Sequence, residues 1–156
     1  MMDDTKPPAW MADQEPREVL IAFLRRAAID WEKGDVAHLA ADASASAAEN
    51  LYAEIKCVDD VLSALDLLIA SVRQYALARS EKFTYDHELD VLQMIVHDWA
   101  TPVSIGKETC RFLLQQDNSK SVLLELSAIL LKYLKQIDDL LGSCRQAFLI
   151  DQPRDA

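Results

Sequence analysis

A long stripe of apolar residues, spaced alternately four and three positions apart, constrains the fold of this chain more than any other feature. Its members are Leu51, Ile55, Val58, Leu62, Leu65, Ile69, Val72 and Ala76. Residues at this spacing lie on one face of an α-helix, and such a stripe is typical of helices that pack side by side. We interpret it as the core of a helical bundle rather than as a free-standing coiled coil. The pattern fits a bundle within one chain and a seam between two copies equally well.

Residues that break helices are rare in the rest of the chain. The 156 residues include only three glycines and five prolines, and Pro102 is the only proline between Pro16 and Pro153. Hydrophobic residues make up 51% of the chain and charged residues 27%, which is the composition of a globular protein. So few breakers in a long apolar sequence predict an all-α fold of one domain or two closely joined ones.

The charge of the chain argues against two classes of partner. The net charge is -10 and no run of Lys or Arg exceeds two residues, so nucleic acid and anionic membrane surfaces are disfavoured. The most apolar window, residues 61–70, contains Asp66 and is too short to span a bilayer. The opening Met-Met-Asp-Asp does not resemble a secretory signal. We therefore expect a cytoplasmic protein.

The cysteines Cys57, Cys110 and Cys144 are odd in number, far apart and set among apolar residues. This pattern favours thiols in a hydrophobic core in a reducing compartment over a disulfide or a zinc site. We accordingly expect no bound metal and no cofactor.

The chain divides into three expected parts. Residues 1–14 are polar and contain prolines, so we expect a frayed N-terminus. Residues 15–82 form an N-terminal helical segment, in which the first helix begins at Pro16 and ends near Gly34, and a second helical region starts near Val36 and carries the long stripe. Residues 83–150 form two further helices. The apolar face of the first helix comprises Leu20, Phe23, Leu24, Ala27 and Trp31.

The last two helices are expected to form an antiparallel hairpin. Thr84 is the predicted N-cap of the third helix, and residues 117–119 are the predicted turn before the fourth. Each helix spans about thirty residues, or about 45 Å, and their similar length favours side-by-side packing. Their apolar stripes are too wide for one partner, so we expect two hairpins to pair into a dimeric four-helix bundle. The stripes comprise Leu89, Leu92, Val96, Trp99, Val103, Gly106, Cys110 and Leu113, and then Leu123, Leu130, Leu134, Ile137, Leu141, Cys144 and Phe148.

The third helix also carries a polar strip that begins at a histidine. Its members are His97, Thr101, Ser104 and Glu108. They share one helix face, which is rotated away from the apolar stripe. Pro102 interrupts the same helix, where a proline costs about 3 kcal/mol or more and bends the axis. We therefore predict an exposed histidine beside a kink.

These residue types suit phosphoryl transfer. A neutral imidazole nitrogen is an effective nucleophile near neutral pH. The adjacent carboxylate of Asp98 can orient the ring and take up a proton. A hydroxyl one turn further on, that of Thr101, can position a water for hydrolysis. His38 and His87 have no such neighbours, and we interpret both as ordinary surface histidines.

Residues 96–103, Val-His-Asp-Trp-Ala-Thr-Pro-Val, resemble the H-box of sensor histidine kinases, whose pattern is His, Glu or Asp, an apolar residue, Arg, Thr, Pro and Leu. Residues 134–145 are similar to the end of that family's second helix, an apolar-Asp-Leu-Leu run followed by Ser and Arg. The similarity spans about residues 86–148. It implies a dimerisation and phosphotransfer hairpin with His97 as phosphoacceptor, Asp98 as acid/base partner and Thr101 as the hydroxyl that assists dephosphorylation.

The chain departs from the family pattern in two respects. Ala100 stands where the family has Arg, and Trp99 where it has an aliphatic residue. The missing Arg is expected to weaken contacts with nucleotide or with a partner domain. The family's ATP-binding domain is a separate α/β module with Asn-rich and Gly-rich boxes, and only eight residues follow Phe148. We therefore do not expect this chain to bind ATP as those kinases do.

The resemblance predicts a two-component signalling protein that is a homodimer. It would carry phosphate on His97 and exchange it with a response regulator receiver domain or a separate histidine kinase. The alternative is a non-catalytic helical scaffold that binds and regulates a kinase or a regulator through the same surface. Two further hypotheses are a phosphatase cofactor that acts through Thr101 and a piece of a longer kinase.

Overall fold

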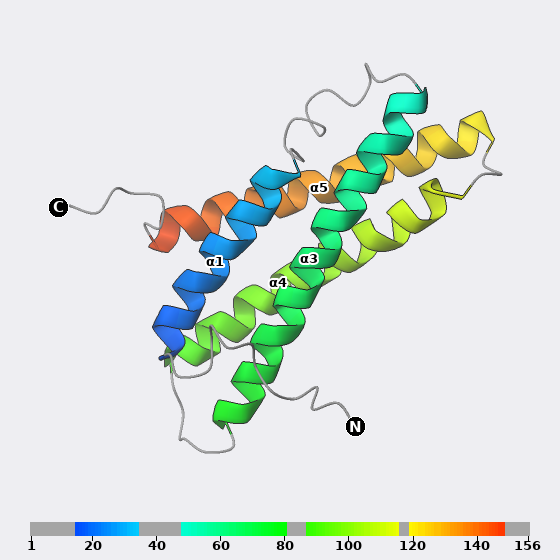
Figure 1. The fold of residues 1–156 in the computed structure, drawn as a ribbon. Coiled ribbons are helices and arrows are strands. Elements are labelled where there is room, and N and C mark those ends of the chain that lie inside the picture. The colour runs from blue at the N-terminus through cyan, green and yellow to red at the C-terminus, as the bar shows by residue number, and fades with distance from the viewer. Residues whose placement is uncertain (1–14, 35–47, 81–86, 116–118, 149–156) are drawn as a thin grey trace.

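The computed structural model describes residues 15–34, 48–80, 87–115 and 119–148. These residues form four helices, α1 (Pro16–Lys33), α3 (Ala48–Ser80), α4 (His87–Leu113) and α5 (Lys120–Phe148), and no strand occurs among them (Figure 1). The all-α prediction is confirmed. The N-terminus up to residue 14, the region around Val36 and the predicted cap Thr84 lie outside the described residues, as do the side chains of Leu51 and Phe148.

The ends of two helices follow from local hydrogen bonds. α1 begins at Pro16 as predicted, and the backbone N–H of Glu15 donates to the carboxylate of Glu18 at 3.4 Å. At the other end, the N–H of Gly34 donates to the carbonyl of Asp30. α5 begins after Ser119, whose hydroxyl accepts the N–H of Val122 at 3.3 Å. Side chains of this kind satisfy backbone N–H groups that have no partner within the helix.

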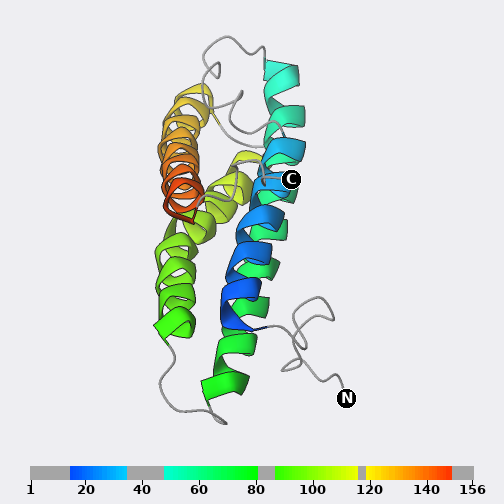
Figure 2. The ribbon, with the colours of Figure 1, turned by 90° about the vertical axis from the view of Figure 1, so that its left-hand side faces the viewer.

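The central element of the bundle is α4. It packs against α3 on one side and against α5 on the other, and these two interfaces are the most extensive in the fold. The shorter α1 contacts all three other helices. Figure 2 shows α1 running along α3, while α5 lies on the other side of the molecule.

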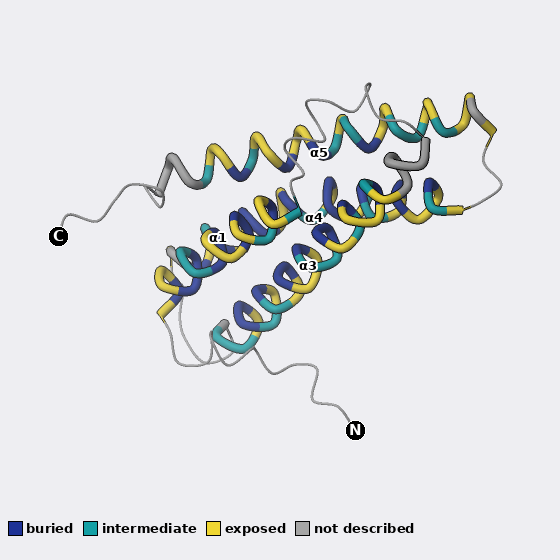
Figure 3. Tube along the Cα trace, turned by 45° about the horizontal axis from the view of Figure 1, so that its top comes forward, coloured by how far each residue is buried: buried dark blue, intermediate teal, exposed yellow. Residues whose placement is uncertain are grey.

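The apolar faces predicted from spacing are buried. On α3 every member of the stripe from Ile55 to Ala76 belongs to the core, as does every member of the stripe from Leu89 to Leu113 on α4. On α5, Leu130, Leu134, Ile137 and Leu141 are buried. The α3 stripe is therefore covered within one chain. Figure 3 shows the buried positions of the four helices turned toward one another.

A single hydrophobic core connects α1 to the other helices, so it extends across the predicted boundary at residues 82 and 83. The rings of Phe23 and Trp99 lie with their centroids 5.6 Å apart and their planes tilted by 56°. Trp31 donates from its indole Nε1 to Asp138 Oδ1 at 3.1 Å, which joins α1 to α5. An aromatic pair in this tilted geometry contributes beyond the area it buries.

In the part of the chain that the structure describes, no helix combines the length and apolar character needed to cross a membrane.

Gly106 of α4 lies close to Leu62 of α3. A Cβ atom added to it would lie 2.9 Å from Leu62 Cδ1, in the core, whereas one added to Gly142 on α5 would meet nothing within 4 Å. We expect Gly142→Ala to raise the free energy of unfolding by about 0.5–1 kcal/mol, because alanine favours the helix. Gly106→Ala has the same favourable effect on helix stability, but it must also displace the packed side chain of Leu62, which costs about 1–3 kcal/mol.

Urea unfolding of the two alanine variants measures this difference. We expect Gly106→Ala to be less stable than Gly142→Ala by at least about 1 kcal/mol. Equal stabilisation of both variants would show that α3 and α4 do not approach each other closely at Gly106.

Candidate functional site

The predicted polar strip lies on the surface of α4. His97, Thr101, Ser104 and Glu108 are all exposed. The apolar positions interleaved with them, including Val96, Trp99 and Val103, are in the core. The register predicted for His97 is therefore confirmed, and its imidazole is open to an approaching partner.

Pro102 lies inside α4 and is buried. Proline has no backbone N–H, so the carbonyl of Asp98, four residues earlier, does not receive the usual helical hydrogen bond from this position. In Figure 2, α4 changes direction part-way along its length. A proline is a common cause of such a bend. The helix therefore carries its irregularity in the turn that follows His97.

A pocket of about 370 Å³ lies beside His97 between α3 and α4. It is lined by Val72, Arg73 and Leu77 from α3 and by Gln93, Val96 and His97 from α4. Arg73 and Gln93 are exposed at its rim. Sequence reasoning missed both residues, because no spacing within one helix indicates which residue of another helix lies opposite.

The three predicted site residues are not all brought together. His97 lines the pocket on the α3 side, while Asp98 and Thr101 are exposed but lie outside the pocket lining. Asp98 is close enough to α5 for its negative charge to raise the pKa of the Cys144 thiol. Within the described residues, no hydrogen bond joins Asp98 to His97 or to Thr101.

Cys144 of α5 lies close to the indole of Trp99 on α4. Burial is the main cause that raises the pKa of Cys144; Asp98 adds to it, and the Trp99 indole N–H acts in the opposite direction. The indole nitrogen is buried and has no hydrogen bond of ordinary geometry among the described residues. A thiol with a raised pKa is a weak nucleophile near neutral pH.

The prediction of core thiols is right for Cys110 and wrong for Cys57. Cys110 is buried, and desolvation, with a smaller effect of Asp59, raises its pKa to about 12. Cys57 is exposed, because it lies between two stripe positions and its side chain points away from the core. All three cysteines are free thiols. Among the described residues, no group of three or more His, Cys, Asp or Glu side chains is arranged to hold a metal ion.

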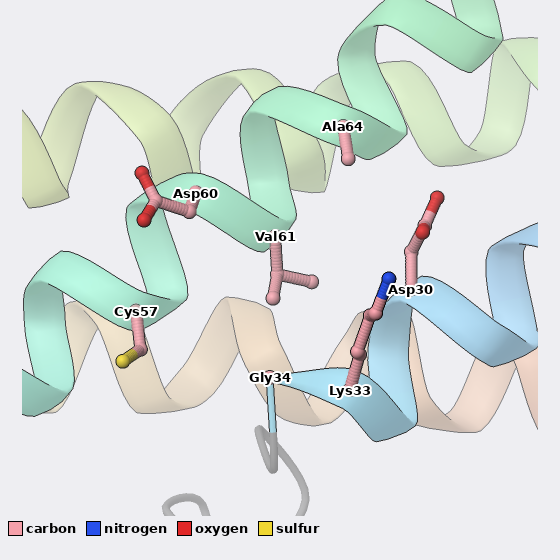
Figure 4. A pocket seen from close by; sticks show the side chains of 7 residues that line it. All are labelled: Asp30, Lys33, Gly34, Cys57, Asp60, Val61 and Ala64. Carbon is pink, nitrogen blue, oxygen red and sulfur yellow. The ribbon is translucent and has the colours of Figure 1, made fainter.

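A second pocket, of about 260 Å³, lies where the end of α1 meets α3 (Figure 4). Its lining includes the charged residues Asp30, Lys33 and Asp60 and the exposed thiol of Cys57. It shares no residue with the pocket at His97. Asp30 already forms an ion pair with Arg26 within α1. The polar groups of this second pocket thus carry both signs of charge and define no single class of ligand.

Comparisons with protein-family models, with curated proteins and with solved structures found no match.

Proposed function

We propose that this protein is a histidine phosphotransfer protein of two-component signalling. His97 would accept a phosphoryl group and exchange it with the aspartate of a response regulator receiver domain or with a separate histidine kinase. The observation that carries the proposal is the position of His97, which is exposed on α4 at the edge of a pocket and five residues before a buried proline. The H-box-like order of residues 96–103 supports it.

The proposed transfer requires a neutral imidazole. One ring nitrogen of His97 attacks the phosphorus of an aspartyl phosphate, so that a P–N bond forms while the P–O bond breaks and releases the donor's carboxylate. The second ring nitrogen carries the proton, which Asp98 can accept once its side chain turns toward the ring. Thr101 would position water for the hydrolysis of the phosphoryl group. The reaction needs no cofactor in this chain.

A homodimer is part of the proposal, and the exposed apolar residues support it. Phe112 near the end of α4 and Val122, Leu124 and Ile129 near the start of α5 all expose large apolar side chains. All four lie toward the end of the molecule where α4 ends and α5 begins (Figure 1). Exposed apolar surface can mark a place where proteins associate. The proposed site of action is the cytoplasm.

The proposal predicts that incubation with a phosphorylated receiver domain will label the wild-type protein with acid-labile phosphate. His97→Ala should abolish the label, because it removes the accepting nitrogen. His87→Ala is the matched control, since His87 is also exposed on α4, and it should keep the label. Absence of label on the wild type, or equal label on His97→Ala, would contradict phosphotransfer.

The second candidate function is a non-catalytic scaffold, which the same exposed apolar residues near the α4–α5 connection favour. A scaffold would bind a receiver domain or kinase with an affinity that His97→Ala leaves unchanged, and it would take up no phosphate. A phosphatase cofactor would instead show slower regulator dephosphorylation in Thr101→Ala than in His97→Ala. Binding and labelling measured on the same three proteins separate these functions.

A further inference from the structure

We propose that Arg73 of α3 binds the phosphoryl oxygens at His97, so that the pocket between α3 and α4 is a phosphoryl-binding site built from two helices. This inference rests on the proposed function, because it assigns a ligand class to the same histidine. Arg73 would be a residue that touches the reacting group, although it comes from outside the segment that resembles an H-box.

The lining of the pocket has an apolar floor, and three of its four exposed residues are polar; the fourth is Leu77. Val72 and Val96 are core residues and close its inner side. Arg73, Gln93 and His97 are exposed around the opening and are the polar members of the lining. The side chains present are thus a guanidinium, an amide and an imidazole, which together offer several hydrogen-bond donors and no carboxylate. Such a set favours an anion with several oxygens.

Arg73 has no acidic side chain paired with it in the described part of the chain. Among the described residues it forms no ion pair, whereas Arg26 pairs with Asp30, Lys107 with Asp66 and Arg111 with Glu108. A guanidinium matches the geometry of phosphate oxygens and can bind two of them at once. Arg73 is therefore available for a ligand.

Helix α4 supplies no cation of its own around His97. Residues 93–101 contain neither Lys nor Arg, and Asp98 adds a negative charge next to the histidine. A phosphoryl group on the ring would bring further negative charge. The pocket places the cation of a second helix, Arg73 of α3, in the same lining as His97. Charge and geometry thus point to the same residue.

The test compares wild type with Arg73→Ala, Arg73→Lys and Arg25→Ala, using phosphoramidate as the phosphate donor. Arg25 is exposed on α1 and lies outside the pocket lining. Arg25→Ala therefore removes the same charge from the protein as Arg73→Ala but leaves the pocket intact. We expect Arg73→Ala to lower the second-order rate of His97 labelling about 10- to 100-fold, as for a lost hydrogen bond to a charged group. Arg73→Lys should recover part of the rate, since lysine restores the positive charge but cannot form the bidentate hydrogen bonds of a guanidinium. Arg25→Ala should label like wild type.

A second measurement tests phosphate binding without requiring phosphoryl transfer to His97. Titration of inorganic phosphate should shift the His97 ring resonances of wild type at millimolar concentrations, and Arg73→Ala should weaken this binding by a similar factor. Wild type that binds phosphate but takes no label would overturn the proposed transfer and leave the binding site intact. Equal labelling and equal phosphate titration in wild type and Arg73→Ala would overturn the assignment of Arg73 while phosphotransfer on His97 stands.

Discussion

Leu24→Asp is expected to lower the free energy of unfolding of the whole chain by about 4 kcal/mol or more. The Leu24 side chain has no exposed surface, on the face of α1 that enters the common core. The substitution removes the burial of a large apolar side chain, which contributes about 1.5–3 kcal/mol, and places a carboxylate among apolar neighbours. The carboxylate can reach water only if α1 detaches from the core, and detachment would expose the other apolar residues that α1 buries.

Urea unfolding followed by circular dichroism measures this effect. The matched control is Ile29→Asp, which makes the same kind of change on the same helix at a side chain that is 55% exposed. We expect the control to change the free energy of unfolding by no more than about 0.5 kcal/mol. Both variants alter the net charge equally, so the difference between them reports burial alone.

The outcome also tests the division at residues 82 and 83 that the sequence predicts. If α1 and α3 formed an independent segment, Leu24→Asp would split the transition and leave the unfolding of α4 and α5 unchanged. We expect one transition shifted to lower urea, because Phe23 touches Trp99 of α4 and Trp31 binds Asp138 of α5. An unshifted transition for α4 and α5 would show that these contacts contribute little.

Much of the fold could be predicted from the sequence because helical spacing fixes which face of a helix is buried. The stripes of α3 and α4 followed from this rule, and the start of α1 at Pro16 followed from the preference of proline for the first turn of a helix. The partner of each face could not be predicted in the same way. A stripe such as that from Ile55 to Ala76 has the same pattern whether α4 of the same chain or a second copy covers it.

In the candidate site, too, the residues within one helix could be predicted from the sequence and those from the neighbouring helix could not. The exposure of His97 and Thr101 followed from their helical register, which depends on neighbours within two turns. Arg73 and Gln93 entered the site only through the packing of α3 on α4, which no local pattern specifies. The error at Cys57 arose from reading apolar neighbours instead of register, since adjacent helical positions point about 100° apart.

Trp99→Ala is expected to lower the free energy of unfolding by about 3–5 kcal/mol, since it empties the space of a large side chain in the core. Trp99 is 1% exposed and lies two residues after His97, on the opposite side of α4. Met94→Ala is the control on the same helix, because Met94 is 59% exposed, and we expect a change within about 0.5 kcal/mol. Chemical unfolding of both variants supplies the comparison.

A double-mutant cycle with Phe23→Ala decides whether this cost reflects the link between α1 and α4. The Phe23–Trp99 pair is lost in either single variant, so the double variant should be about 0.5–1.5 kcal/mol more stable than the sum of the single losses predicts. Strict additivity would mean that the two rings contribute through separate contacts. A coupling of the expected size would show that the helix carrying His97 is held in part by α1, which local sequence patterns place far from it.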